Sequence, residues 1–421
     1  MKYKAVRGME DILPEDVKIW QALEKIARTL LESYGYREIR TPILEDTAIF
    51  TGSIGENTDI VTKEMYTFKD RKGRSLTLRP EGTAPIVRAY IEHSFDKISP
   101  EQKFYYIGPM FRSERPQKGR SRQFHQIGVE AFGTHSAYAD AEVIMQLSKM
   151  LEIFGLKNFT IKLNTLGCKN DKDKFAKKLQ KFLEDKKKHL CKDCRERLTK
   201  NTLRVLDCKN DSCKQVVREA PDMSDSLCAA CGEHFEKLKN ILKKLNVRFE
   251  EDKSIVRGLD YYTGTVFEVT HPDLGAQDAI GAGGRYDSLV RDLGGSSTGA
   301  VGYALGTERM ILALRQEIPR LKAFIVICVA TLGDQAKLKG IQIAEEIRMA
   351  LPGFFVFTDI KEASLKSQMR AADRNKADFA IIIGEDELKA GKVTFRDMAK
   401  KEQVSVGTGD ILAEIKKRIK R

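Results

Sequence analysis

Apolar residues recur at the spacing of an amphipathic helix in two stretches before residue 155. One covers residues 15–33, begins after Pro14 and ends before Gly35. The other covers residues 137–154 and is closed by Gly155. We therefore predict two long surface helices here, each with one face against a core.

Between these helices the pattern changes to strands. Residues 36–44 predict a strand, and Pro42 within it indicates a sheet edge or a subunit boundary, because proline cannot donate a ladder hydrogen bond. Residues 65–80 and 104–133 alternate and are rich in aromatic and β-branched side chains. We expect antiparallel strands in both, with residues 70–73 forming a hairpin turn in the first.

The composition shifts sharply at residues 169–245, where lysine runs, six of the eight cysteines and helical spacing replace the strands. Strand-like patterns return at 255–270 and 299–305, and a helix is predicted over 307–314. The simplest organisation is a β-rich domain formed by residues 1–168 and 246–318, interrupted by a helical insertion.

From residue 319 to residue 421 the pattern predicts a separate small domain in which strands alternate with helices. The predicted elements are strand 323–330, helix 334–350, strand 353–358, helix 363–376 and strand 378–383, followed by a hairpin and a closing helix. Such alternation favours βαβ units and a largely parallel sheet.

The composition narrows the class of protein. With 42% hydrophobic residues, 421 residues can bury real cores, which excludes disorder for most of the chain. No apolar run approaches the roughly 18 residues that span a bilayer, and the first eight residues lack the apolar segment of a secretory signal, so we expect a cytoplasmic protein without membrane contact. The net charge of +13 only weakly favours a polyanionic partner.

The strongest chemical signal lies at residues 106–126, where five basic residues fall within eleven positions. Arginines at the rim of a strand–loop–strand suit a phosphate clamp, although a solvated hairpin tip has the same composition. Gln126 and Glu130 share one strand face and are expected to line one pocket. Arg112 and Glu114 also share a face, which favours either exposure or a ligand site.

These stretches resemble known motifs. Residues 111–124 resemble motif 2 of the class II aminoacyl-tRNA synthetases, residues 35–44 their motif 1 and residues 302–309 their motif 3. Residues 257–264, Arg-Gly-Leu-Asp-Tyr-Tyr-Thr-Gly, resemble the signature that histidyl-tRNA synthetases add to the class. Two further stretches agree with that family: 78–83 and 283–287. The resemblance runs from about residue 7 to the end of the chain.

The resemblance implies an α+β fold, with an antiparallel-sheet catalytic domain carrying the helical insertion and a C-terminal α/β anticodon-binding domain. It implies a histidine–tRNA ligase, which joins histidine to the α-phosphate of ATP, releases pyrophosphate and transfers the histidyl group to the 3' end of tRNA(His). Mg²⁺ is expected at the β- and γ-phosphates. Motif 1 implies a homodimer with twofold symmetry.

The resemblance also carries roles onto individual residues. The catalytic arginines match Arg112 and Arg257. The positions that bind histidine match Glu81, Thr83, Arg112, Gln126, Glu130, Arg257, Tyr261 and Tyr262. Those that bind ATP match Arg112, Glu114, Arg120 and Arg309. The loop that meets the tRNA acceptor end matches Arg115, Gln117 and Lys118.

The cysteines are a separate question. Three pairs lie in the insertion at spacings typical of zinc sites: Cys191 and Cys194, Cys208 and Cys213, and Cys228 and Cys231. Zinc takes four ligands, so six thiols leave one pair spare or a second site incomplete. Cys168 and Cys328 are interpreted as ordinary buried thiols, and His125 as a structural strand residue. The lysine runs of the insertion indicate either a solvated helix face or contact with tRNA backbone.

Two alternatives remain at this level. One is a catalytically inactive relative that serves as a regulatory subunit of ATP phosphoribosyltransferase. The presence of the C-terminal domain and of Arg112, Arg257 and Arg309 argues against it. The other is a class II synthetase for glycine, proline or threonine, which the 257–264 signature disfavours.

Overall fold

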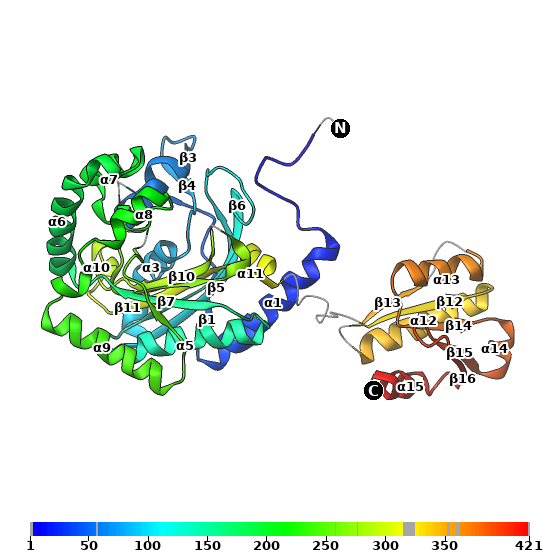
Figure 1. Cartoon of the computed structure of the whole chain (residues 1–421). Coiled ribbons are helices and arrows are strands. Elements are labelled where there is room, and N and C mark those ends of the chain that lie inside the picture. Colours follow the sequence, from blue (N-terminus) through cyan, green and yellow to red (C-terminus); the bar gives the residue numbers. More distant parts are fainter. Residues whose placement is uncertain are drawn as a thin grey trace. The chain divides into compact units, whose positions relative to one another are not determined.

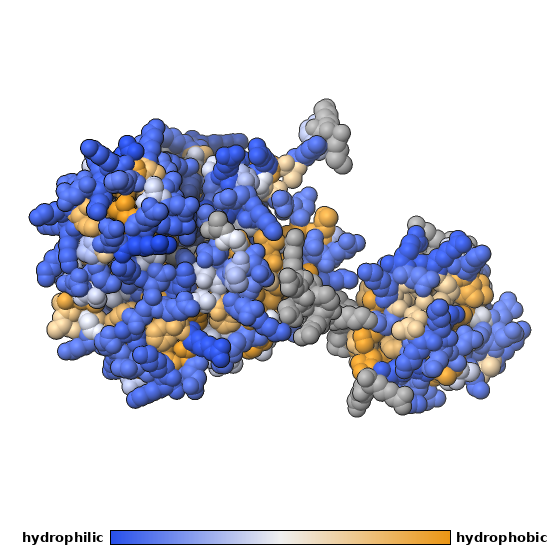
Figure 2. Space-filling view, viewed as in Figure 1, coloured by the Kyte–Doolittle hydropathy of each residue, from blue (hydrophilic) through white to orange (hydrophobic). Residues whose placement is uncertain are grey.

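In the computed structural model the chain forms two compact units, Met1–Pro319 and Arg320–Arg421. The structure describes residues 3–55, 58–256, 258–275, 277–314, 325–351, 354–358 and 363–419. Within these ranges no helix has the length and apolar character needed to cross a membrane. Hydrophilic side chains cover most of the visible face of each unit (Figure 2).

The first unit is built on an eight-stranded sheet with the order β1-β5-β6-β11-β10-β9-β7-β8 (Figure 1). Its strands are β1 (Arg37–Glu38), β5 (Gln102–Phe111), β6 (Gln123–Phe132), β7 (Thr160–Thr165), β8 (Glu250–Glu251), β9 (Thr263–Thr270), β10 (Ala279–Arg285) and β11 (Ala300–Gly306). All neighbours pair antiparallel except the two edge pairs, β1 with β5 and β7 with β8. The prediction of an antiparallel catalytic sheet is therefore confirmed.

Helices cover both faces of this sheet, because its strands carry apolar side chains on both sides. On one face Val129 of β6 shares a core with Leu23 of α1 (Pro14–Ser33) and Leu147 of α5 (Ala137–Ile153). On the other face Phe132 of β6 shares a core with Val87 of α3 (Thr83–Glu92). The shorter helices are α2 (Thr47–Ile54), α4 (Phe95–Ile98), α10 (Leu289–Asp292), α11 (Thr307–Leu314) and the π-helical turn η1 (Ile60–Glu64).

The predicted strand over residues 36–44 is wrong as one element. Only Arg37–Glu38 join the large sheet, at its edge as Pro42 indicated. The chain then leaves that sheet and enters a small one as β2 (Leu44–Asp46), beside β4 (Ser75–Leu78) and β3 (Tyr66–Lys69). The guanidinium of Arg79 donates to the carbonyl of Thr41 at 3.0 Å. This buried side chain therefore supports the segment between β1 and β2, which lies outside both sheets.

The turn between β3 and β4 is formed as predicted. Gly73 adopts a φ of +80°, which glycine tolerates without strain. The carboxylate of Asp70 accepts the N–H groups of Lys72 and Arg74 at 2.8 and 2.9 Å. These bonds explain why this short polar segment reverses the chain.

The strand predicted to start at residue 255 begins only at Thr263. The preceding residues form a loop instead, because their backbone groups bond elsewhere. The N–H of Asp260 donates to Ile54 at 2.9 Å, and the Lys172 ammonium donates to the carbonyl of Asp260 at 2.9 Å. This departure brings the 258–262 loop to the site described below.

The insertion is helical, as its spacing predicts. Its α-helices are α6 (Lys169–Asp185), α7 (Lys192–Lys200), α8 (Asp211–Arg218) and α9 (Ala229–Lys244), with 3-10 turns between them at Lys187–His189, Thr202–Val205 and Met223–Ser226. Leu179 and Leu198 share one core with Val87 of α3 and Phe104 of β5. The insertion thus packs directly on the rest of the first unit. Its boundaries at residues 169 and 245 stay a prediction.

The C-terminal unit has a mixed sheet with the order β13-β12-β14-β15-β16. Its elements are β12 (Val326–Thr331), α12 (Asp334–Ala350), β13 (Phe355–Thr358), α13 (Leu365–Arg374), β14 (Phe379–Ile383), α14 (Glu385–Ala390), β15 (Lys392–Asp397), β16 (Gln403–Gly407) and α15 (Ile411–Ile419). The first three strands are parallel and the last two antiparallel, so a largely parallel sheet is only half right. The short link after β14 is the reason, because a parallel crossover needs roughly a dozen residues.

Candidate active site

A cleft of about 1380 Å³ opens over the central strands of the first unit. Its floor comes from strands β6, β9, β10 and β11, and the start of α3 and the 258–262 loop form one end. Most of the predicted site residues line it: Glu81, Thr83, Arg112, Glu114, Arg120, Gln126, Tyr261, Tyr262 and Arg309. Arg257 lies outside the described residues.

Glu81 anchors the end of the cleft formed by α3. Its carboxylate accepts the backbone N–H groups of Thr83 and Ala84 at 2.7 and 2.8 Å, and the Tyr261 hydroxyl lies 3.4 Å from it. These amides are the unpaired donors of the first helical turn, so the sequence places an acid where a helix start can hold it. Burial nevertheless raises the pKa of Glu81. An ammonium group of a ligand would compensate this buried charge.

Glu130 lies behind Thr83 and does not line the cleft itself. It is 1% exposed; the Thr83 hydroxyl donates to one carboxylate oxygen at 2.7 Å and the Tyr286 hydroxyl to the other. Burial raises the pKa of Glu130 to about 8, although both hydrogen bonds oppose the rise. Gly302 lies across from it in β11, and a Cβ there would overlap the carboxylate. Gln126 and Glu130 were predicted to line one pocket. Gln126 lines the cleft, whereas Glu130 lies behind Thr83.

Tyr106 lines the cleft, although its sequence position predicted no role for it. Its ring lies so close to Gly82 and Gly128 that a Cβ at either position would overlap it. Its buried hydroxyl and the side-chain oxygen of Gln126 have no hydrogen-bond partner among the described residues. Buried polar atoms are rarely left unpaired, so both groups are available to a polar ligand. The only sequence signal is an aromatic residue facing a glycine on the paired strand.

Arg112 leaves the end of β5 and enters the cleft. Its Nε donates to the carbonyl of Pro80 at 2.9 Å, and its guanidinium lies 5.3 Å from the ring centroid of Phe124. Among the described residues no carboxylate forms an ion pair with it. Glu64 is nearby, and burial raises the pKa of that carboxyl group. Arg112 is thus held in place while its charge remains available to an anion.

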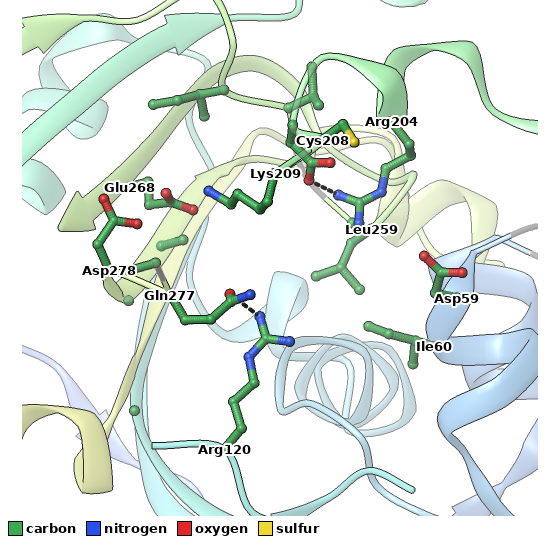
Figure 3. Close-up of a pocket in the computed structure, with 18 of the residues that line it drawn as sticks. Asp59, Ile60, Arg120, Arg204, Cys208, Lys209, Leu259, Glu268, Gln277 and Asp278 are labelled. Atoms are coloured by element: carbon green, nitrogen blue, oxygen red, sulfur yellow. Dashed lines mark hydrogen bonds and ion pairs between the residues drawn. The ribbon is translucent and has the colours of Figure 1, made fainter. Parts of the chain in front are cut away.

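Two further arginines occupy the other part of the cleft. Arg120 forms an ion pair with Glu114 at 3.1 Å. It also donates to the Gln277 side chain at 2.8 Å (Figure 3). Arg309, in the first turn of α11, donates to backbone carbonyls of Gly119, Gln277 and Ala279. Burial and the neighbouring Arg120 lower the pKa of Arg309. Two cations this close favour a bound polyanion.

The cleft also contains acidic groups that no motif indicated. Glu268 of β9 and Asp278 line it beside Gln277, and Lys209 of the insertion extends towards Glu268 (Figure 3). Carboxylate oxygens are the ligands that Mg²⁺ prefers. This part of the cleft therefore contains both cations that suit a polyanion and carboxylates that suit a divalent ion.

The insertion contributes one wall of the cleft. Arg197 of α7 forms an ion pair with Asp59 at 3.2 Å, and the Asn201 amide donates to Asp260 at 3.1 Å. Arg204 also lines the cleft and pairs with Asp207 (Figure 3). Polar contacts therefore fasten the insertion to the segment around Asp59 and to the 258–262 loop.

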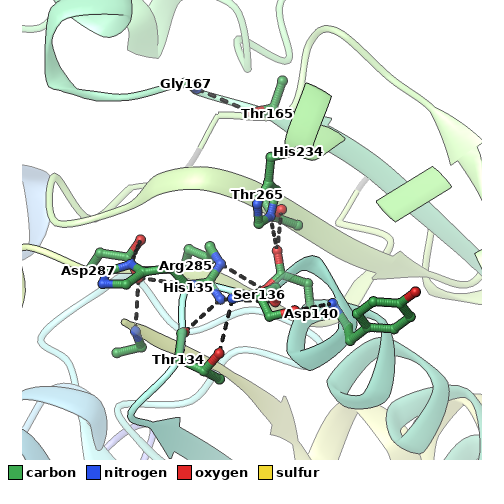
Figure 4. A network of polar contacts seen from close by, with 12 residues as sticks. Thr134, His135, Ser136, Asp140, Thr165, Gly167, His234, Thr265, Arg285 and Asp287 are labelled. Carbon is green, nitrogen blue, oxygen red and sulfur yellow. Dashed lines mark hydrogen bonds and ion pairs between the residues drawn. The ribbon is translucent and has the colours of Figure 1, made fainter. Parts of the chain in front are cut away.

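A buried ionic network supports the sheet beneath α5 (Figure 4). Asp140 is completely buried and pairs with Arg285 at 2.8 Å and with His234 of α9 at 2.9 Å, and the Thr265 hydroxyl donates to it at 2.6 Å. Arg285 also pairs with Asp287 at 2.7 Å. The network ties the catalytic strands to the last helix of the insertion.

His125 has the structural role expected of it. Its backbone N–H donates to the Glu308 carboxylate, its ring Nδ1 lies 3.0 Å from the same group, and its ring packs edge-on against Trp20. The loop residues Arg115, Gln117 and Lys118 are exposed and lie outside the cleft. Their accessibility is compatible with a macromolecular partner.

The cysteines form two clusters, each with four potential ligand atoms within 4.8 Å of one another. The first consists of Cys191, Cys194, Cys208 and Cys213. The second joins Cys228 and Cys231 to Cys168 and Asp171. The interpretation of Cys168 as an ordinary buried thiol is wrong, because it is half-buried and belongs to this cluster; Cys328 is buried as expected. Sequence spacing missed Cys168 and Asp171 because they lie far from the third pair along the chain.

Two family models match this chain. The model of histidyl-tRNA synthetase matches residues 8–310, and that of an anticodon-binding domain matches residues 324–418. The chain belongs to the histidyl-tRNA synthetase family. The first match spans the whole cleft and the second the C-terminal unit.

Relatives within the histidyl-tRNA synthetase family extend this match over the full length. The histidine–tRNA ligase of Thermodesulfovibrio yellowstonii is 48% identical over 421 residues, covering 99% of both chains. That of Thermosipho melanesiensis is 47% identical over 407 residues, covering 96% of both. The crystal structure of the apo histidyl-tRNA synthetase of S. aureus superposes with a TM-score of 0.79 at 36% identity and covers 98% of this chain and 99% of that one.

Proposed function

We propose that this protein is a histidine–tRNA ligase whose first step takes place in the cleft described above. The observation that carries the proposal is that the two ends of the cleft differ in charge. One end offers buried acceptors, Glu81 and Gln126, and the other offers the cations Arg120 and Arg309. The charge of Arg112 acts on the carboxyl group of Glu81, and the charges of Arg112 and Arg120 both act on that of Glu64. An amino acid and a nucleoside triphosphate fit these two ends, with Arg112 where they meet.

In the first step an oxygen of the histidine carboxylate attacks the α-phosphorus of ATP. A new C–O–P linkage forms, the bond from the α-phosphorus to the bridging oxygen breaks, and pyrophosphate leaves with that electron pair. Both reactants are anions, so catalysis requires cations that hold them together and stabilise the charge of the transition state. Arg112 and Arg257 are assigned this role.

Arg120 and Arg309 would hold the β- and γ-phosphates, and Glu114 would orient Arg120 through their ion pair. Mg²⁺ would neutralise charge on the leaving pyrophosphate, with Glu268 and Asp278 as its protein ligands. In the second step a hydroxyl of the terminal tRNA ribose attacks the histidyl carbonyl, and AMP leaves.

Selection of histidine would rest on polar groups buried around the side chain. Glu81, Thr83 and Gln126 are assigned to the α-amino group, and Tyr261 and Tyr262 to the imidazole. Glu130 lies behind Thr83 and would act on the ligand through the Thr83 hydroxyl. An amino acid without ring nitrogens would leave such groups unpaired, so rejection should be strong.

The macromolecular partners follow the same proposal. The exposed Arg115, Gln117 and Lys118 are assigned to the acceptor end of tRNA(His), and the C-terminal unit to the anticodon. Motif 1 begins in the edge strand β1, which suits an interface between two copies in a cytoplasmic homodimer.

We also propose that the first cysteine cluster holds one zinc ion. The Sγ atoms of Cys191 and Cys208 lie 3.9 Å apart. A tetrahedral ion with Zn–S bonds of about 2.3 Å separates its sulfurs by about 3.8 Å. The N–H of Cys191 donates to the Cys213 sulfur at 3.2 Å, which orients that ligand.

Histidine-dependent exchange between ATP and pyrophosphate tests the activity. The Arg257→Ala variant should abolish exchange while the dimer persists in analytical ultracentrifugation, and Arg71→Ala, an exposed arginine of the β3–β4 turn, is the control. Absence of exchange in the parent protein, with ATP still bound, would instead support a regulatory subunit. Normal exchange by Arg257→Ala would remove the role assigned to that residue.

A further inference from the structure

The second cysteine cluster lies where the insertion joins the catalytic fold. Cys168 immediately precedes α6, and Asp171 lies in the first turn of that helix. Cys228 immediately precedes α9, and Cys231 lies in the first turn of that one. The cluster therefore connects the entry of the insertion to the start of its last helix, which are about 60 residues apart in the sequence.

Asp171 is the unusual member. It is 2% exposed, and its carboxylate accepts the N–H groups of Cys168 at 3.3 Å and Cys228 at 3.1 Å. Within the described ranges no lysine or arginine forms an ion pair with it. In place of a cationic partner, hydrogen bonds hold this buried carboxylate, from the two N–H groups and from the thiols of Cys168 and Cys231, and three sulfur atoms surround it. A cation bound by these sulfurs would compensate its charge directly.

The donor set indicates which cation. Three sulfurs and one carboxylate oxygen within 4.8 Å of one another suit a tetrahedral Zn²⁺. Sulfur donors disfavour Mg²⁺ and Ca²⁺. Cys228 and Cys231 flank the start of a 16-residue helix, whose N-terminal dipole stabilises thiolate ligands.

We propose that the insertion binds two zinc ions, and that the second, held by Cys168, Asp171, Cys228 and Cys231, fastens the entry of the insertion and the start of its last helix to the histidine side of the cleft. The competing explanation is that Asp171 only caps α6. In that case the thiols bind no metal, and the acid accepts hydrogen bonds only from the two backbone N–H groups and from the thiols of Cys168 and Cys231.

The second site is linked to the cleft through the residues beside its ligands. Lys172, next to Asp171, donates to the carbonyls of Asp260 at 2.9 Å and Tyr262 at 3.3 Å. The N–H of Gly264 donates to the carbonyl of Gly167 at 2.8 Å. Fixing the start of α6 therefore fixes the loop that presents Tyr261 and Tyr262. This part of the inference rests on the proposed histidine site, and it makes the metal ligands positioning residues.

The metal content of the full-length protein, purified without chelator, tests the proposal without any substrate. We expect two zinc ions per chain in the parent and one each in Cys231→Ser and Cys194→Ser. The matched control is Cys328→Ser, a buried thiol of β12 in the other unit, which should keep two. Cobalt substitution should give thiolate-to-metal absorption that Cys231→Ser reduces by close to half. One zinc or none in the parent, or two in Cys231→Ser, would overturn the second site.

Asp171→Asn keeps one oxygen, which can still accept the N–H of Cys168 and cap α6, and it removes the charge and the second acceptor, which bonds to Cys228. It therefore remains informative if a cysteine variant folds poorly. We expect its second zinc to be lost to a competing chelator at roughly tenfold lower chelator concentration or less. Equal retention of zinc by Asp171→Asn and the parent would show that Asp171 is only a cap.

The positioning role has its own readout. In pyrophosphate exchange Cys231→Ser should raise KM for histidine several-fold and leave KM for ATP within twofold, because the link runs to Tyr261 and Tyr262. An unchanged KM for histidine in a variant that has lost one zinc would overturn this role. Complete absence of exchange in the parent protein would contradict the proposed function instead, and the zinc count would still stand.

Discussion

Replacing Glu130 by glutamine should change how the stability of the first unit depends on pH. The carboxyl group is 1% exposed, and burial raises its pKa from about 4.5 to about 8. Glutamine has nearly the same shape as the protonated acid. It can accept from the Tyr286 hydroxyl and donate to Thr83, so the packing is retained.

The sign follows from proton binding. Between pH 4.5 and 8 the folded state retains a proton on Glu130 that the unfolded state has lost, so this group destabilises the fold as pH rises. One proton corresponds to at most about 1.4 kcal/mol per pH unit. Over the three units from pH 5 to pH 8 the contribution is at most about 4 kcal/mol, and it levels off above pH 8.

The measurement is urea-induced unfolding followed by circular dichroism at several pH values between 5 and 9. The free energy of unfolding of the parent should fall relative to that of Glu130→Gln as pH rises, by a few kcal/mol in total. Glu184→Gln, at an exposed position of α6, is the control and should run parallel to the parent. Parallel curves for the parent and Glu130→Gln would refute the reasoning, because Glu130 would then titrate as in the unfolded chain.

Three further predictions concern the cleft. Tyr106→Phe removes a hydroxyl with no partner among the described residues, so the melting temperature should hold while KM for histidine in pyrophosphate exchange rises about tenfold. Gly128→Ala places a Cβ in the Tyr106 ring and should destabilise the protein by about 1–3 kcal/mol in urea unfolding, whereas Gly232→Ala, in open space on α9, should not. Arg120→Ala should raise KM for ATP at least about tenfold and leave histidine affinity, measured by calorimetry, unchanged.

Each of these has a result that would contradict it. An unchanged KM in Tyr106→Phe would mean that the hydroxyl meets no ligand. Equal stability of the two alanine variants would mean that β5 and β6 can separate at Gly128. A loss of histidine affinity in Arg120→Ala would place that arginine at the histidine end of the cleft, contrary to its assignment to ATP.

The fold was largely readable from the sequence, because local patterns encode single elements well. Helical spacing predicted α1 and α5 within one or two residues, and the Asp70–Gly73 turn was predicted from its composition. The errors fall where long-range contacts override local preference. The 258–262 loop has strand-like composition, yet its backbone bonds to Ile54 and to the Lys172 side chain instead of a neighbouring strand.

The candidate site divides in the same way. Residues within the motifs, such as Arg112 and Arg120, were predicted because the motifs are contiguous and resemble a known family. Tyr106 and Gln277 were missed because nothing in their own segments distinguishes them from packing or loop residues. Only the pairing of Tyr106 with Gly128, and of Gln277 with Arg120, shows what they contact.

By itself the sequence determined most of the elements and the family, and it predicted the cations of the site, since each depends on residues that lie close together in the chain. The tertiary structure alone decided that Glu130 lies behind Thr83, and that Cys168 and Asp171 join Cys228 and Cys231. The physical reason is that burial, and the approach of groups distant in sequence, arise only when helices pack on the sheet. The free energy of a buried carboxylate or a four-ligand metal site depends on that packing.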